Sequence, residues 1–453
     1  MLIQFKIKNF KSFYHDTVIN MVADTKKQEL KNNLISIPLT KKGKKILPAI
    51  VIYGSNASGK TSIIEAFNTF KRIIINGTIS KSINNGAINR LEICPFIHDI
   101  QKIGEPIEFE ITFQSKLNIY NYLLSFQVNS PFNKNERMIK KEVLNIIHYQ
   151  EFGNSIKEEK LNLFERIENQ IHLNNSKEVL DIYNKTEKYG EELKTKEKDF
   201  SENLDQEGLF LNNAYKSTIS LKIVNDILDW FQNDLFVVTN FNKKISNINF
   251  NIEDEEENSL YGNKVIDRLL KLADFGPQKI LFAKHKDQVE NRDKYILTSA
   301  YKPKGYHEGG LLIPAEFIES RGTTKLLDFW MALMNFLPKG GTMVIDELDA
   351  SLHPELIYGI IELFQNPEVN KKGAQLIFNT HNPIYLQKTL FRRDQILFVE
   401  KDEKTYMSTI YRLSDFDVYT TNNYLKKYFE GDFGALPYID FRSAMEVNKK
   451  NNG

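Results

Sequence analysis

The residues best suited to chemistry lie in one glycine-containing run, GSNASGKT, from Gly54 to Thr61. It matches the pattern G-x-x-x-x-G-K-[ST], in which backbone N–H groups surround phosphate oxygens and the following helix adds its positive N-terminal end. In that pattern Lys60 contacts the β- and γ-phosphates and Thr61 binds Mg²⁺. The alternative is a chance match in a turn, but an apolar run before it and a helix-like run after it favour a phosphate site. The predicted phosphate-binding residues are Gly54, Ser55, Asn56, Ala57, Ser58, Gly59, Lys60, Thr61 and Ser62.

A second candidate is the acidic pair Asp346 and Glu347, which follows the buried run TMVI. Open α/β sheets bind ligands at the carboxyl ends of their strands. At such an end Asp346 can hold Mg²⁺ directly or through water, and Glu347 can orient or deprotonate an attacking water. Acidic pairs at strand ends also cap helices, so the pair alone is weak evidence for a metal site. Together with the phosphate loop it becomes strong evidence.

Two further signals are weaker when taken alone. Ser320 and Gly322 precede an amphipathic run in ESRGTTKLL, where a helix N-terminus offers N–H groups to an anion. An ordinary helix cap is the alternative, and the local sequence favours it. His381 directly follows a buried strand in NTHNP, a position where a lone histidine is usually structural.

The elements that must position these residues alternate between strands and helices. Apolar, strand-like runs occur in LPAIVIY, GTMVIDE and AQLIFNT, and helix-like runs in TTKLLDFWMALMNFL and PELIYGIIELF. This alternation predicts a parallel α/β core divided between the two ends of the chain. The sequence predicts an N-terminal half at 1–135, an inserted region at 136–300 and a C-terminal half at 301–453.

The inserted region and its borders follow other patterns. IEFEITF, NYLLSFQV, EVLNIIHY and NLFERI predict antiparallel hairpins. A charged, helical segment is expected from about Ser176 to Trp230, and a solvated loop at EDEEE, from Glu253 to Glu257.

Composition limits the classes of protein. The 453 residues contain 60 Lys and Arg and 59 Asp and Glu, so the formal net charge of +1 neither implies nor excludes a nucleic-acid partner. With one cysteine, Cys94, the chain can form no internal disulfide, and a cysteine-based zinc site is disfavoured. No signal peptide and no membrane-spanning run are recognised, so we expect a cytoplasmic protein with no membrane partner.

The order NFKSF, GSNASGKT, ESRGT, IDELDASLHP, NTHNP resembles the ABC-type ATPase heads of the SMC and RecF-like group. It is more similar still to the bacterial AAA-family ATPases related to the OLD-family heads, including the RloA- and AriA-like ATPases of anti-phage systems. FRRDQILFVEKD and YFEGDFGALPYI resemble the tail of that family, whereas the middle of the chain matches poorly. The resemblance implies a split ABC-type P-loop NTPase head, with an antiparallel β subdomain and a helical insertion, that uses ATP and Mg²⁺.

The resemblance also implies roles for particular residues. It assigns Gly54–Thr61 to Walker A, and Asp346 and Glu347 to Walker B. Lys60, Glu347 and the switch histidine His381 are then catalytic, with Thr61 and Asp346 as metal ligands. Ser320 and Gly322 match the signature that contacts the γ-phosphate from an opposite subunit, which implies a homodimer or higher oligomer. The D-loop would be Asp349, Ala350, Ser351 and Leu352.

Two departures from the family pattern are visible. The signature ESRGT contains less glycine than is usual in ABC proteins. No clear Q-loop glutamine follows the first helix, and Gln101 is too weak a match to receive that role.

The function implied by the resemblance is an ATP-hydrolysing switch or sensor in anti-phage defence. It would act with a separate effector such as a nuclease, because the roughly seventy residues after His381 leave no room for a nuclease domain. One alternative is a DNA-associated ATPase of the RecF or SMC kind in repair, which keeps DNA open as a partner. Another is an ATP-binding scaffold with negligible turnover.

Overall fold

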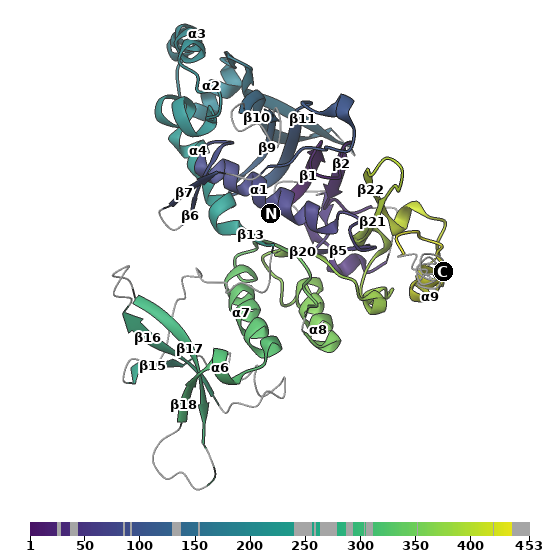
Figure 1. The fold of residues 1–453 in the computed structure, drawn as a ribbon. Helices are drawn as coiled ribbons and strands as arrows, with labels where there is room; N and C mark the ends of the chain where they lie inside the picture. Colours follow the sequence, from purple (N-terminus) through teal and green to yellow (C-terminus); the bar gives the residue numbers. More distant parts are fainter. Residues whose placement is uncertain are drawn as a thin grey trace, which may run out of the picture. The chain divides into compact units, whose positions relative to one another are not determined.

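The structure is a computed structural model of the 453-residue chain. The residues that it describes are 1–24, 29–36, 44–84, 87–90, 93–128, 137–152, 155–239, 256–257, 260–262, 279–286, 293–302, 304, 311–350, 352–419 and 421–436. The chain divides into two compact units (Figure 1). The first contains residues 1–239, 337–347 and 361–453, and the second contains residues 240–336 and 348–360.

The first unit contains the sheet that the apolar runs predict. Its strand order is β13-β19-β20-β5-β21-β22. All neighbouring pairs are parallel except β21 and β22, which form an antiparallel hairpin. The strands are β5 (Ala49–Gly54), β13 (Leu235–Val238), β19 (Thr342–Ile345), β20 (Gln375–Asn379), β21 (Ile396–Lys401) and β22 (Ser408–Arg412).

This sheet combines distant parts of the sequence. β5, from the N-terminal part of the chain, lies between β20 and β21, which come from the C-terminal part. Every residue of β5 and β20 is buried, as expected for strands covered on both faces. The structure therefore confirms an α/β fold whose central sheet is split between the two ends of the sequence.

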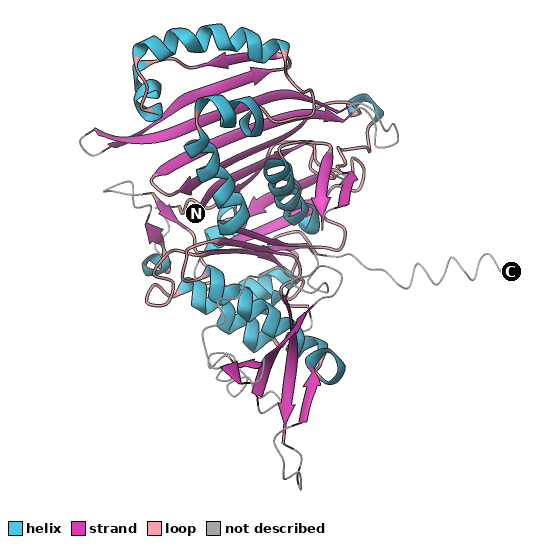
Figure 2. Cartoon of the chain, turned by 90° about the vertical axis from the view of Figure 1, so that its left-hand side faces the viewer, coloured by secondary structure: helices cyan, strands magenta, loops and turns pink. Residues whose placement is uncertain are grey.

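A seven-stranded antiparallel sheet forms the other layer of the first unit, in the order β12-β11-β10-β9-β8-β1-β2 (Figure 2). Its four longest strands follow one another as hairpins, which confirms the prediction for this region. In β1 the buried Ile3, Phe5 and Ile7 alternate with more exposed polar residues. The strands are β1 (Leu2–Lys8), β2 (Thr17–Asn20), β8 (Ile107–Ser115), β9 (Asn118–Val128), β10 (Arg137–Phe152), β11 (Ser155–Ile167) and β12 (Gln170–Leu173).

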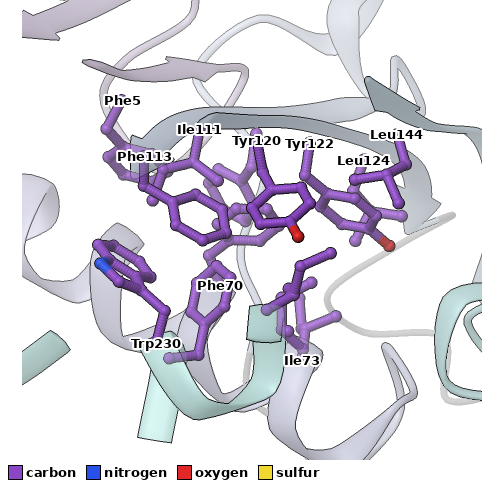
Figure 3. Packing of buried hydrophobic residues seen from close by; sticks show 14 of the residues in the cluster. Phe5, Phe70, Ile73, Ile111, Phe113, Tyr120, Tyr122, Leu124, Leu144 and Trp230 are labelled. Carbon is purple, nitrogen blue, oxygen red and sulfur yellow. The ribbon is translucent and has the colours of Figure 1, made fainter. Parts of the chain in front are cut away.

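Helix α1 (Lys60–Asn76) contacts both sheets of the first unit. Its buried residues recur at three- and four-residue spacing, and the helix ends at Gly77, whose φ of 68° is readily adopted by glycine. Phe70 stacks on Phe5 of the antiparallel sheet, with ring centroids 5.9 Å apart (Figure 3). Phe113 of the same sheet stacks on Trp230 with ring centroids 4.2 Å apart, so one aromatic core joins α1, the sheet and the inserted helices.

The segment from Ser176 to Trp230 is mainly helical, as predicted. Its regular elements are α2 (Lys177–Tyr183), α3 (Glu187–Glu202), the π-helix η3 (Leu211–Ile219) and α4 (Leu221–Asp229), and a second π-helix, η4 (Trp230–Asp234), follows. Helix α3 packs along β12 and buries only Gly190 and Leu193, so its many Lys and Glu side chains form a solvated face. The two π-helices were not predicted from the sequence.

The second unit contains an antiparallel sheet that the sequence did not predict, in the order β14-β15-β16-β17-β18. The prediction of a loop at EDEEE is wrong for Glu256 and Glu257, which form β14, while residues 253–255 lie outside the described residues. The elements are β14 (Glu256–Glu257), β15 (Leu260–Gly262), β16 (Lys279–Lys286), β17 (Asp293–Tyr301), β18 (Leu311–Pro314), α6 (Ala315–Ile318) and α7 (Arg321–Phe336).

The remaining elements are short, apart from one helix. They are β3 (Ile35–Ser36), β4 (Lys45–Ile46), β6 (Lys81–Asn84), β7 (Ala87–Arg90), α8 (Pro354–Gln365) and α9 (Tyr424–Phe429), with 3-10 turns η1 (Lys31–Asn33), η2 (Ile100–Lys102), η5 (Pro383–Tyr385), η6 (Arg393–Gln395) and η7 (Leu413–Asp415). The three-part division of the chain at residues 135 and 300 stays a prediction. In the described ranges no helix has both the length and the apolar composition that crossing a bilayer would need.

A buried charged pair fixes the helical segment to the antiparallel sheet. Glu142 and Arg166 lie opposite each other on β10 and β11, and both are fully buried. The Glu142 carboxylate accepts hydrogen bonds from the Tyr122 hydroxyl at 2.8 Å and from the backbone N–H groups of Phe210 and Leu211 at 2.8 and 2.9 Å. Burial raises the pKa of Glu142, and the opposing effect of the Arg166 charge is smaller.

We expect Glu142→Ala to lower the free energy of unfolding by about 3–5 kcal/mol, because it leaves a buried arginine charge without its counterion. The matched control is Glu165→Ala on β11. Glu165 pairs with Lys141 at 2.7 Å, but both side chains are partly exposed, so its loss should cost about 1 kcal/mol or less. Urea unfolding followed by circular dichroism measures both changes, and equal losses would contradict the structural role of Glu142.

Candidate active site

The phosphate loop connects β5 to α1, as its sequence predicts. An added Cβ at Gly54 would lie 2.5 Å from the carbonyl oxygen of Val399, so only glycine fits beside β21 there. Gly59 has a φ of +114°, and a Cβ there would lie 2.8 Å from Ser12 Oγ and 2.9 Å from Ser408 Oγ. Gly54 is thus required by a close backbone contact, and Gly59 by its positive φ together with two nearby serine hydroxyls.

Lys60 lies across the inside of this loop. Its Nζ donates hydrogen bonds to the carbonyl oxygens of Gly54 and Ser55, both at 2.8 Å, and the side chain is buried. Burial lowers the pKa of Lys60 to about 8, and the negative charges of Asp346 and Glu347 oppose this shift. The lysine is therefore still mainly charged at neutral pH and is held next to the backbone that would surround phosphate oxygens.

A chain of hydrogen bonds joins the loop to the acidic pair. The Thr61 hydroxyl donates to Asp346 Oδ1 at 3.1 Å, and Asn379 Nδ2 donates to the same oxygen at 2.5 Å. Asn379 Oδ1 in turn accepts the Glu347 N–H at 2.5 Å. The pKa of Asp346 is raised mainly by burial, while the bonds from Asn379 and Thr61 oppose the shift. The two residues predicted as metal ligands are thus in direct contact, although they are far apart in the sequence.

Glu347 has an unusual backbone for a residue of its type, with a φ of 49°. It follows directly after β19 and Asp346, and its side chain is exposed. A non-glycine residue in the left-handed region is costly and persists only where its surroundings hold it. Here the hydrogen bond from its N–H to Asn379 holds the backbone in this conformation.

One cavity of about 510 Å³ brings most of the predicted site residues together. It lies entirely within the first unit, and Glu347 and His381 line it together with residues of the phosphate loop. The complete lining is Lys11, Ser12, Asn56, Ala57, Ser58, Gly59, Lys60, Thr61, Ser62, Cys94, Pro95, Ile97, His98, Glu347, His381 and Lys401.

Sequence reasoning missed several residues that line the cavity or support the loop and the acidic pair. Asn379 lies two residues before the predicted His381, and adjacent parallel strands would have placed it beside Asp346. The turn containing Lys11 and Ser12 belongs to NFKSF, a run recognised only as part of the family pattern. The Ser408 hydroxyl donates to the Ser58 carbonyl oxygen at 2.5 Å and thus supports the loop from β22.

The predicted signature residues, Ser320 and Gly322, belong to the second unit, whereas the residues that line the cavity belong to the first. The Ser320 hydroxyl accepts the Thr323 N–H at 3.1 Å, so it acts as a helix cap within α7. Within the same unit Lys325 Nζ donates to the carbonyl oxygen of Ala350 at 3.1 Å, which ties α7 to the predicted D-loop. Of that loop, Asp349, Ala350 and Leu352 are described, and Ser351 lies outside the described residues.

The donor atoms fit a small divalent cation. The Thr61 hydroxyl and the Asp346 carboxylate are hard oxygen ligands of the kind that Mg²⁺ prefers. The burial that raises the pKa of Asp346 would be offset by a nearby positive ion. Within the described residues no group of three or more His, Cys, Asp or Glu side chains could form an all-protein metal cage. A site with one carboxylate matches the usual binding of Mg²⁺ through one or two carboxylates and substrate phosphates.

Comparison with known proteins gives three findings. No curated protein sequence matches the chain. Among solved structures, the chain is similar to the SMC head domain from Thermotoga maritima, with 14% identity over 91% of this chain and 98% of that one, and a TM-score of 0.33. Residues 49–386 match the family described as "AAA domain, putative AbiEii toxin, Type IV TA system", a span that includes the phosphate loop, the acidic pair and His381. The chain therefore belongs to this AAA-domain family.

Proposed function

We propose that the protein binds ATP with Mg²⁺ in this cavity and hydrolyses it. The observation that carries the proposal is the contact between the phosphate loop and the acidic pair. Thr61, at the start of α1, donates a hydrogen bond directly to Asp346, and Glu347 lines the same cavity as Lys60. Phosphate release by the purified chain, measured with ATP and Mg²⁺, tests the proposal directly.

The chain's own residues supply three parts of the reaction. Backbone N–H groups of the loop and the start of α1 bind the phosphates, and Lys60 adds a positive charge beside the β- and γ-phosphates. Thr61 and Asp346 would hold Mg²⁺, which would neutralise charge that develops on the phosphate oxygens during the reaction. Glu347 orients the attacking water and accepts its proton, while His381, at the end of β20, faces the same cavity.

We further propose that two chains enclose two nucleotides between them. Ser320 and Gly322 would then supply hydroxyl and N–H donors to the γ-phosphate bound by the other chain, where they stabilise charge that develops during reaction. The support for this role is the likeness of ESRGT to the signature of ABC-type heads. Capping of α7 by Ser320 is compatible with it, because the same helix N-terminus presents further N–H groups.

Mixed dimers test this arrangement. We expect Ser320→Arg to be inactive alone, because its bulk blocks the contact, and to regain part of the activity when mixed with Lys60→Ala chains, since one composite site escapes both changes. Rescue requires that one intact site can react by itself, so ATP-dependent dimerisation is measured in parallel by size-exclusion chromatography.

The matched control is Ser220→Arg, which removes another serine cap, that of α4, where Ser220 Oγ accepts the Ile223 N–H at 3.3 Å. It should lose stability of about 0.5–2 kcal/mol and keep both hydrolysis and dimerisation. Full hydrolysis by a Ser320→Arg protein that remains monomeric with ATP would exclude the role across the dimer.

We propose that ATP-driven association of two chains acts as a switch in anti-phage defence, with a separate effector such as a nuclease. The support is the resemblance to anti-phage ATPases and the family description, which names a toxin of a type IV TA system. Plaque counts on cells carrying the gene with its neighbouring genes test the role. Wild-type protein should protect these cells and Lys60→Ala should not, whereas equal plaque counts would contradict the defence role.

A further inference from the structure

The cavity is lined by residues on both sides of the phosphate loop, and the residues proposed to act on the γ-phosphate, Glu347 and His381, lie on one side. In the parallel sheet β5 lies between β20 and β21. Glu347 and His381 follow β19 and β20, on one side of β5, whereas Lys401 ends β21, on the other side. Ile97 and His98 line the same cavity. The reacting phosphate belongs on the side of Glu347, so the far side is available to the rest of a nucleotide.

His98 is one of two histidines in the cavity lining, the other being His381, and its ring is held from two directions. Its ring stacks on that of Tyr406, with centroids 4.9 Å apart and an interplanar angle of 27°. The ring of Phe96 contacts it edge-on at 5.4 Å. Phe96 is itself buried and donates its backbone N–H to Asn9 Oδ1 at 3.1 Å. His98 lines the cavity and its side chain is exposed, whereas Tyr406 is outside the cavity lining.

The turn that carries Tyr406 is fixed in an unusual conformation. Tyr406 has a φ of 57°, and its N–H donates to the carbonyl oxygen of Asp402 at 2.9 Å. The Asp402 carboxylate accepts the Thr405 N–H at 2.7 Å, which closes the turn between β21 and β22. Lys401 Nζ lies over the Tyr406 ring, 5.5 Å from its centroid. A bulky residue held in the left-handed region is a local strain that the turn must compensate, and such strain concentrates at functional sites.

We propose that the His98 ring is the stacking platform for the nucleobase of the bound nucleotide, with Tyr406 as a positioning residue that holds it. This inference rests on the proposed ATP binding and identifies which residues of the same cavity contact the base. The exposed His98 ring lines the cavity, and a base stacked on it would continue the stack of Tyr406 and His98. Stacking tolerates any base, so the platform supplies affinity more than discrimination between bases.

The test compares two ligands that differ in whether they contain a nucleoside. Dissociation constants for ATP and for inorganic tripolyphosphate, each with Mg²⁺, are measured by calorimetry on the full chain. We expect His98→Ala to weaken ATP binding about tenfold or more and to leave tripolyphosphate binding unchanged. His98→Phe should restore ATP binding because it keeps an aromatic face.

Tyr406 is tested with a variant suited to its backbone. Asparagine tolerates the left-handed region better than most residues, so Tyr406→Asn removes the ring with little strain. It should weaken ATP binding less than His98→Ala does, again without changing tripolyphosphate binding, and Tyr406→Phe should behave as wild type. The matched control is Tyr419→Ala, which removes an aromatic ring that is 71% exposed and outside the cavity lining, and which should change neither ligand.

The outcomes separate the two levels of inference. If wild-type protein binds neither ligand, the proposed function fails. If wild-type protein binds ATP but His98→Ala binds both ligands as wild type does, or loses both in equal proportion, the platform is overturned while ATP binding stands. Lys60→Ala, which should weaken both ligands, shows that the assay detects a lost phosphate contact.

Discussion

Replacing Lys60 with alanine is expected to abolish measurable ATP hydrolysis, with a loss of at least about 10²–10³-fold. The Lys60 side chain is buried inside the phosphate loop, with Nζ 2.8 Å from two loop carbonyl oxygens. When phosphates bind, the same ammonium group can turn from these oxygens to the β- and γ-phosphates without crossing solvent. Alanine leaves neither the charge nor the donors, so binding of ATP should weaken as well.

Lys71 provides the matched control on the same helix. Lys71 is half-buried, burial lowers its pKa to about 8, and its Nζ donates to the carbonyl oxygen of Leu235 at 2.5 Å. Lys71 does not line the cavity, so Lys71→Ala should keep its specific activity even if it changes stability. Phosphate release and ATP binding are measured for both variants. Wild-type values of both for Lys60→Ala would reject the site.

Glu347→Gln is expected to stop hydrolysis and to retain ATP, with turnover lowered by about 10²–10⁴-fold. Glutamine keeps the shape of the side chain and the backbone N–H bond to Asn379, but it cannot accept a proton from water. ATP that is bound but not hydrolysed should then hold two chains together. A shift to a larger species on size-exclusion chromatography with ATP and Mg²⁺ measures this association.

The control for Glu347→Gln is Glu355→Gln, an exposed glutamate in the first turn of α8. It should hydrolyse ATP as wild type does and show no trapped species. Normal turnover by Glu347→Gln would mean that another group activates the water. Loss of turnover without retained ATP would instead indicate that Glu347 contributes to binding.

The phosphate loop and the acidic pair could be predicted because their signals are local. The loop pattern stands between a buried strand and an amphipathic helix, and each of these is visible within twenty residues of sequence. Asn379 could not be recognised in the same way. Its role depends on β19 and β20 being neighbours, which brings its side chain to Asp346 and Glu347. The binding and catalytic roles of the loop residues, of Asp346 and Glu347, and of Ser320, Gly322 and His381 stay predictions.

Other parts of the fold could not be predicted because their local sequence patterns are typical of a different environment or are too irregular. Glu142 lies in a strand where a charged residue ordinarily marks the solvent face, and only the register with Arg166 shows that it is buried. The strands of the second unit contain lysines and other polar residues that weaken their alternation, as in KILFAKHK. The sequence around His98 does not indicate a binding role, because its contact with Tyr406 joins two residues that are far apart in the chain.

The position of β5 between β20 and β21 has a consequence for biosynthesis. Its partners on the two sides, residues 375–379 and 396–401, leave the ribosome long after residues 49–54. Until then both edges of an apolar strand lack their hydrogen-bonding neighbours, a state that favours mispairing and engagement by chaperones. Translation must pass Lys401 before the strand below the phosphate loop is enclosed. The part of the site that is made first is thus among the last to be completed.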